Sequence, residues 1–146
     1  MARVKEQVNL EWVARLRLVV LRLGRRLRQN ASAGLTPSQL SVLSSLDLHG
    51  PLSLGDLAAH EGVQPPSVTR MAGALEEAGL VRRSGSESDR RSVVVSLTAE
   101  GRRALDDLRR QRDAWLARRL SGLSPEQVAA LEAALPVLEE LLGERP

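Results

Sequence analysis

The sequence has no cysteine, no phenylalanine and no tyrosine, and Trp12 and Trp115 are its only tryptophans. Without a thiol, the chain forms no disulfide, no cysteine-based redox switch and no thiolate metal site. Because large aromatic rings are scarce, a hydrophobic core must be built from leucine, valine and alanine. The 42% of residues that are apolar are enough to support such a core in a globular fold.

Long apolar runs are also missing. No segment approaches the roughly 20 apolar residues of a membrane-spanning helix, and the N-terminus lacks the apolar stretch and small-residue cleavage site of a signal peptide. We therefore expect a cytoplasmic protein with no membrane partner. The sequence has no plausible Ser-His-Asp grouping and no phosphate loop, so we do not expect an enzyme. With His49 and His60 as the only histidines, a zinc site would lack its three or four ligands, and no cofactor is expected.

Arginine is abundant and makes up all but one of the 21 basic residues. Residues 1–30 hold eight basic and two acidic residues, whereas residues 124–146 hold one basic and five acidic residues. The two ends therefore carry opposite charge, as expected for segments that pack together within one chain or between two chains. Such complementarity sets orientation more than it supplies binding energy.

The hydrophobic pattern of the chain is mostly helical. Apolar residues recur every three or four positions over residues 9–28, with arginines on the opposite side. Residues 36–39, Thr-Pro-Ser-Gln, form a capping box that opens a second helix, which should end at His49-Gly50-Pro51. A third helix, capped by Ser53 and stopped at Gly62, is followed by a fourth over residues 64–79, with Gly79 as its C-cap. We expect Val68, Met71, Leu75 and Ala78 on the buried side of this fourth helix.

Two later segments are typical of strands, residues 80–83 and 92–97, and turn residues lie between them. They should pair as a hairpin, whereas residues 52–54 are too short for more than a bridge. Two short helices joined at a glycine and followed by a hairpin predict a mainly helical winged helix-turn-helix fold.

Two more helices should follow the hairpin, one capped by Thr98 and one opened by a second capping box at residues 124–127. In the last helix, apolar residues step by three and four positions, which is typical of a helix that packs on another helix. These residues include Leu131, Leu135, Leu138 and Leu142. Pro136, which lies between them in the sequence, should kink the helix or start a new turn. The extra helices exceed what one winged helix needs, which favours a homodimer.

Three stretches, taken in order, are similar to the MarR family of bacterial transcription regulators. They are Thr36-Pro-Ser-Gln-Leu, the stretch LAAHEGVQPPSVTRMAGALEEAGLVRR at residues 57–83, and the D-x-R motif at Asp89–Arg91 that precedes a strand and Leu97-Thr98. The resemblance covers about residues 9–142. It implies a homodimer that binds a pseudo-palindromic DNA operator and acts as a repressor, with residues 35–98 as the DNA-binding region and residues 1–34 and 99–146 as the dimerisation region.

The fourth helix carries the first group of candidate DNA contacts. Its N-terminal turn would enter the major groove, where Arg70 can bind guanine through two hydrogen bonds and Gln64 can pair with adenine. Arg70 could equally hold a phosphate. The candidate residues of this helix are Gln64, Pro65, Ser67, Thr69 and Arg70.

The hairpin tip carries the second group. An arginine guanidinium is planar and weakly hydrated, so it fits a narrow minor groove of negative potential. By resemblance, Arg91 is the minor-groove residue, Asp89 braces it, and Arg90 lies near phosphate. Ser38 and Ser53, at or near helix N-termini, are candidate phosphate donors.

Family members often bind a small anionic or phenolic effector between the DNA-binding lobe and the dimer helices. By resemblance, such a pocket would draw on Trp12, Arg15, Leu16, Leu43 and Leu46, although a tryptophan of this kind is more often part of the core. An alternative function from another class is a winged helix that serves as a protein-interaction or assembly module without specific DNA binding.

Overall fold

The computed structural model describes residues 9–85 and 92–143 of the chain. The chain divides into two compact units, Met1–Arg112 and Asp113–Pro146. The boundary falls inside the long helix α5 (Ala99–Leu120).

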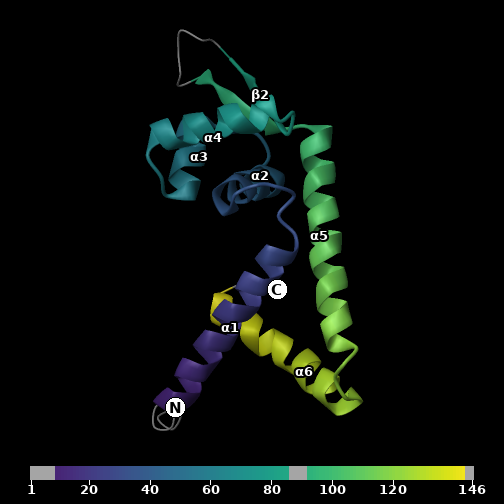
Figure 1. Cartoon of the computed structure of the whole chain (residues 1–146). Coiled ribbons are helices and arrows are strands. Elements are labelled where there is room, and N and C mark those ends of the chain that lie inside the picture. The colour runs from purple at the N-terminus through teal and green to yellow at the C-terminus, as the bar shows by residue number, and fades with distance from the viewer. Residues whose placement is uncertain (1–8, 86–91, 144–146) are drawn as a thin grey trace. The chain divides into compact units, whose positions relative to one another are not determined.

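The first unit contains α1 (Leu10–Asn30), α2 (Pro37–His49), α3 (Leu54–Glu61) and α4 (Pro65–Glu77), followed by a hairpin and the first part of α5 (Figure 1). Local hydrogen bonds explain where these helices begin. The hydroxyl of Thr36 accepts the backbone N–H of Gln39 at 3.2 Å while the Gln39 side chain accepts the N–H of Thr36 at 2.9 Å. The predicted capping box therefore opens α2.

The turn between α3 and α4 also follows the predicted pattern. Ser53 accepts the N–H of Asp56 at 3.0 Å and caps α3, and Gly62 ends this helix in the left-handed conformation with φ of 63°. Pro65 then begins α4, where the lack of an N–H has no cost because a first-turn N–H has no intrahelical partner. The predicted helix-turn-helix is confirmed.

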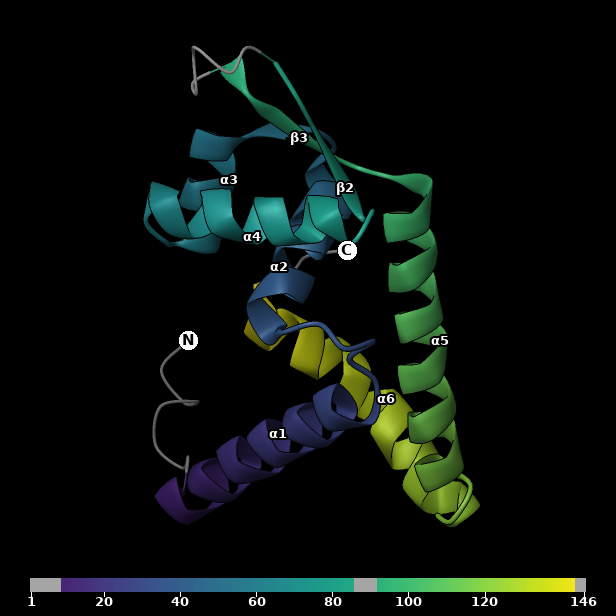
Figure 2. The same cartoon turned by 45° about the horizontal axis from the view of Figure 1, so that its top comes forward.

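A small antiparallel sheet covers these helices (Figure 2). Its strands are β1 (Leu52–Ser53), β2 (Val81–Ser84) and β3 (Val94–Leu97), in the order β1-β3-β2. In the hairpin, Val81 pairs with Leu97 and Ser84 with Val94. The segment expected to form only a bridge is the short edge strand β1, so the sheet has three strands in the described part of the chain.

The hydrophobic core lies where α2, α3 and α4 meet the sheet and α5. It is aliphatic, as the shortage of aromatic residues requires. Its side chains that are fully shielded from solvent are Val42, Leu43, Leu57, Val68, Ala72, Leu75 and Val95. The fold is therefore the mainly helical winged helix-turn-helix that the sequence predicts.

Two expectations about the end of α4 are wrong. Ala78 is exposed rather than buried, because α4 ends at Glu77 and Ala78 is its C-cap. Gly79 is the residue after the cap and has the positive φ of 75°. The chain thus leaves the helix one residue earlier than predicted, which takes Ala78 off the buried side.

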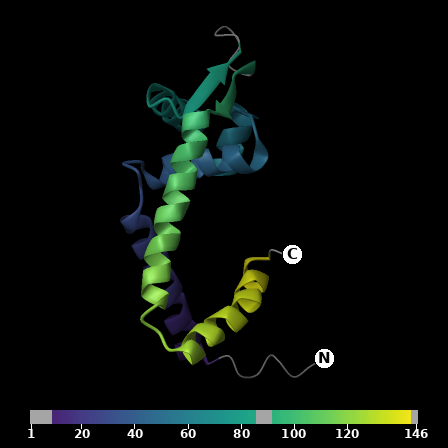
Figure 3. The ribbon, with the colours of Figure 1, turned by 90° about the vertical axis from the view of Figure 1, so that its right-hand side faces the viewer.

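The second unit holds the end of α5 and α6 (Pro125–Leu142), joined by a short turn (Figure 3). Ser124 and Gln127 form the second predicted capping box. Helix α6 continues through Pro136, so the proline does not divide it into two helices. Within the described residues, no helix is both long and apolar enough to cross a membrane.

Candidate DNA-binding site

The N-terminal turn of α4 and the residues just beyond it are open on one side of the helix. Gln64, Pro65 and Arg70 are exposed, whereas Val68 on the opposite side is completely buried. The Gln64 side chain makes no capping hydrogen bond to α4, although this residue is the N-cap. Burial of one side thus fixes which side chains the helix presents outward.

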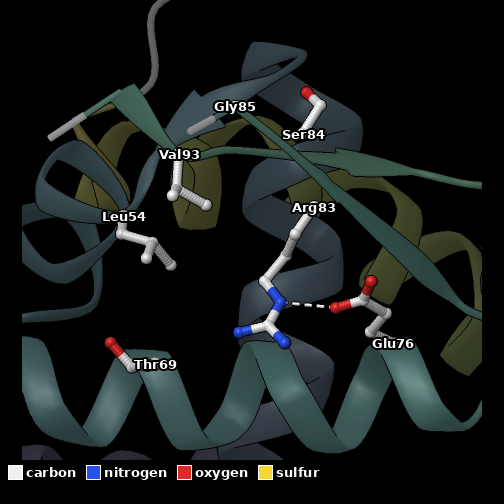
Figure 4. A pocket seen from close by; sticks show the side chains of 7 residues that line it. All are labelled: Leu54, Thr69, Glu76, Arg83, Ser84, Gly85 and Val93. Atoms are coloured by element: carbon white, nitrogen blue, oxygen red, sulfur yellow. Dashed lines mark hydrogen bonds and ion pairs between the residues drawn. The ribbon is translucent and has the colours of Figure 1, made fainter. Parts of the chain in front are cut away.

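Thr69 differs from the other candidate residues of this helix. Its hydroxyl donates a hydrogen bond to the carbonyl of Pro65 at 3.0 Å, and its side chain lines a cavity of about 330 Å³. Figure 4 shows Thr69 on one side of this cavity and Arg83 of β2 projecting into it. Thr69 therefore faces the space between α4 and the sheet.

The same cavity contains an ion pair between α4 and the hairpin. The guanidinium of Arg83 bonds the carboxylate of Glu76, and both side chains are about 38% exposed. An ion pair this exposed adds at most about 1 kcal/mol to stability. Its geometric effect is to connect α4 to β2, the first strand of the hairpin.

The base of the hairpin is held by Thr98. Its hydroxyl donates to the carbonyl of Gly79 at 2.6 Å and accepts the N–H of Gly101 at 3.0 Å, and its N–H donates to the carbonyl of Leu80 at 3.1 Å. One threonine thus caps α5 and ties it to the turn after α4. The threonine that follows β3 in the sequence has this structural reason.

Glycine is required where the backbone of α5 meets this turn. A Cβ added to Gly101 would lie 2.1 Å from the carbonyl oxygen of Leu80 and 2.8 Å from a methyl group of Leu97. Gly85, at the end of the described part of the hairpin, has a φ of 126°, and a Cβ there would lie 2.4 Å from the Ser92 carbonyl oxygen. Gly101 therefore lets α5 lie against the turn after α4, and Gly85 lets the two sides of the hairpin approach each other.

The remaining candidate residues lie in different surroundings. Asp89, Arg90 and Arg91 fall outside the described residues. Ser38 is exposed in the first turn of α2, and Ser53 caps α3.

The residues of the expected effector pocket are also spread over different environments. Leu43 and Leu46 belong to the core, with 0% and 2% of their surface exposed, while Trp12 is 61% exposed. The cavity beside Thr69 involves none of these pocket residues. In the described part of the chain, no group of three or more histidine, aspartate or glutamate side chains could hold a metal ion.

Sequence reasoning missed an ionic network on α2. Asp47 accepts hydrogen bonds from Nη1 of Arg102 at 2.9 Å and from Nη2 of Arg109 at 2.7 Å, and its side chain is only 17% exposed. The hydrogen bond from Arg109 and the charges of both arginines hold the pKa of Asp47 below its ordinary value, against the effect of burial. The only sequence signal was an acidic residue four positions after Leu43, on the inward side of the helix.

The helix-turn-helix, the anchored hairpin and the three-stranded sheet together define a winged helix protein. The sequence profile of the MarR family matches residues 35–93. An HTH-type transcriptional regulator of Mycobacterium tuberculosis is 39% identical over 132 residues, which span 90% of this chain and 92% of the relative. The HTH-type transcriptional repressor MdtR of Bacillus subtilis is 42% identical over 101 residues, 69% of this chain and 64% of that protein.

A solved structure from Pseudomonas aeruginosa, described as a candidate transcriptional regulator, superimposes with a TM-score of 0.81 at 35% identity and covers 93% of this chain and 97% of its own. The chain belongs to the MarR family of helix-turn-helix transcriptional regulators. Its relatives are regulators and not enzymes.

Proposed function

We propose that this protein is a repressor that binds a pseudo-palindromic DNA operator as a homodimer. The observation that carries the proposal is the exposed N-terminal turn of α4, which stands beside a hairpin anchored through Thr98 and Gly101. A helix with this exposure can enter a major groove while the hairpin reaches the neighbouring minor groove. Membership of the MarR family supports the same function.

Base reading is assigned to the exposed residues of α4. Arg70 is solvent-exposed and can donate two parallel hydrogen bonds to guanine, and Gln64 can pair with adenine. Pro65 has a compact side chain, and Ser67 is small, so the backbone can approach the bases closely. Thr69 is assigned a different role, the support of the first turn through its bond to Pro65.

Phosphate contacts are assigned to two helix N-termini. Ser53 accepts a hydrogen bond from the N–H of Asp56, which leaves its hydroxyl proton available to a phosphate oxygen. Ser38 is exposed in the first turn of α2, where the helix dipole favours an anion. These contacts would fix the register of the protein on DNA without reading sequence.

The hairpin tip supplies the minor-groove contact. We expect Arg91→Ala to lower affinity for an operator duplex by roughly tenfold or more, because an inserted guanidinium gains from the negative potential of a narrow minor groove. Fluorescence anisotropy measures the affinity, and light scattering checks that the oligomeric state is unchanged. Arg90→Ala is the matched control, with a uniform and smaller loss across sequences expected of a phosphate contact. Normal operator binding by the Arg91→Ala protein would remove the tip from the mechanism.

Dimerisation is assigned to residues 1–34 and 99–146, and DNA binding to residues 35–98. Neither α1 nor α6 has any buried residue within a single chain, although both are rich in leucine and valine. In α6, Leu131, Leu135, Leu138 and Leu142 are 48%, 54%, 37% and 73% exposed. Apolar surface on this scale is stabilised by a partner helix, and the opposite charges of the chain ends favour a second copy.

We expect Leu135→Asp to convert the dimer into a monomer, because a carboxylate in an apolar helix interface is strongly unfavourable. Sedimentation velocity measures the change. Ala129→Asp adds the same charge at an exposed position on the side of α6 that carries Glu132 and Glu140, and it should leave the dimer intact. A Leu135→Asp protein that sediments as a dimer would contradict the assignment of α6.

A small anionic or phenolic effector could release the protein from DNA. Trp12, Arg15 and Leu16 on α1 stay candidates for its site. The cavity beside α4 supports a second location, because the positive charge of Arg83 lies there with Thr69 opposite. Glu76 pairs with Arg83 in the structure, so an anion would have to compete with this carboxylate.

A further inference from the structure

Helix α5 carries three arginines on one side. Arg102, Arg109 and Arg112 are spaced by seven and three residues, which keeps them on the same face of a helix. Leu105 and Leu108, between them on this face, are each 3% exposed. Buried leucines and arginines therefore share this side of α5.

Two of these arginines hold α2. Arg102 and Arg109 each bind a different oxygen of Asp47, so both carboxylate oxygens are engaged. Arg109 also bonds Asp106 at 3.4 Å, which restrains its guanidinium from the other side. Because Asp47 is mostly shielded from solvent, its contacts are screened less than those of a fully exposed pair.

The third arginine holds the end of α1. Arg112 donates from Nε and Nη2 to the carbonyl oxygen of Ala31 at 3.3 and 3.2 Å. Ala31 is the C-cap of α1 and is 3% exposed. Two residues later, Ala33 has a φ of 52°, and Gly34 follows with a φ of 74°, so the chain turns sharply between α1 and α2. Arg112 therefore fixes the last point of α1 before this turn.

We propose that Asp47 is a positioning residue for operator binding. Through Arg102 and Arg109 it holds the DNA-binding lobe, residues 35–98, to α5. Arg112 holds the end of α1 to the same helix. This inference rests on the proposed function, in which a dimer engages two half-sites together. Binding of the second half-site is then intramolecular, and its strength depends on how rigidly the two lobes are held. If the lobe is held less rigidly, affinity for a single half-site should change little, but affinity for two half-sites in one duplex should fall.

The test compares two DNA duplexes with the full-length chain. The first carries the inverted repeat that the wild-type protein selects from a randomised pool, and the second has one half of that repeat scrambled. We expect Asp47→Asn to weaken binding to the full repeat about tenfold and binding to the single half-site less than twofold. Asp107→Asn is the matched control, since Asp107 pairs only locally with Arg110 on α5, and neither affinity should change.

A second comparison tests whether Asp47 acts through Arg109. The double variant Asp47→Asn/Arg109→Gln should bind the full repeat no more weakly than Asp47→Asn alone, because both changes break the same contact. If Asp47→Asn is too unstable for titration, Arg102→Gln and Arg109→Gln each remove one of the two contacts and take its place. Melting temperatures are measured alongside the affinities.

The outcomes are distinct. If the wild-type protein selects no repeat from the pool, the proposed function fails. If the wild-type protein prefers the full repeat, but the ratio of its affinities for the two duplexes is the same in the Asp47→Asn protein, the positioning role is overturned. Equal losses on both duplexes would assign Asp47 to the stability of the lobe and would also overturn it.

Discussion

A Gly101→Val protein is expected to be destabilised by about 3 kcal/mol or more, which lowers the melting temperature of a chain of this size by roughly 10 °C. The reason is a collision with backbone, since a Cβ at this position would lie 2.1 Å from the Leu80 carbonyl oxygen. That oxygen also accepts the N–H of Thr98. Any shift that makes room for valine must therefore weaken the contacts that hold the start of α5 against the turn between α4 and β2. Thermal unfolding followed by circular dichroism measures the effect.

Gly73→Ala is the matched control for this prediction. Gly73 is also a helical glycine, but beyond its chain neighbours and the backbone of its own helix no heavy atom lies within 4 Å of a Cβ placed there. Alanine should leave stability unchanged or raise it by about 0.5–1 kcal/mol, because it lowers the entropy of the unfolded chain. Similar melting temperatures for the Gly101→Val and wild-type proteins would contradict the prediction, because α5 could then move away from the turn at Leu80 without loss of stability.

An Arg70→Ala protein is expected to lose operator affinity by about 1–3 kcal/mol, or roughly five- to 150-fold. Arg70 is exposed on α4 while Val68 and Ala72 beside it are fully buried, so the substitution should not disturb the core. Arg110→Ala removes the same charge from α5 and should change operator affinity little. Anisotropy titrations of both variants measure the difference.

The same titrations decide between the two roles that Arg70 can have. If Arg70 reads a base, the variant loses discrimination at one base pair of each half-site. If it holds a phosphate, affinity falls equally for all sequences, and the slope of log affinity against log salt concentration becomes shallower by about one. Unchanged affinity in the Arg70→Ala protein would remove α4 from the site as assigned.

The sequence predicts local structure well where one short motif determines it. The capping boxes at Thr36 and Ser124, the Ser53 cap and the stop at Gly62 each depend on residues within four positions of one another, and all are present. The hairpin follows from two short segments typical of strands, residues 80–83 and 92–97, with turn residues between them. The end of α4 was misplaced by one residue because a glycine can end a helix either as the cap or just after it.

Contacts between distant residues could not be predicted in the same way. Asp47 and Arg109 are 62 residues apart in the chain, and no local pattern indicates that they meet. The Arg83–Glu76 ion pair depends on how β2 packs against α4, which the sequence of neither element indicates. The cavity beside Thr69 arises from the same packing. Helical periodicity alone does not distinguish a side chain in solvent from one beside a shallow cavity, which is where Thr69 lies.

Sequence-specific DNA binding is the central claim, and one measurement tests it most directly. The wild-type protein is titrated at several salt concentrations against a duplex from upstream of its own gene and against a scrambled duplex of the same composition. We expect a discrete complex with the upstream duplex in a gel shift, and an affinity that falls steeply with salt as counterions are released from phosphates. No discrete complex, or an affinity for every duplex that is flat between low and moderate salt, would contradict the account and favour a winged helix that binds other proteins.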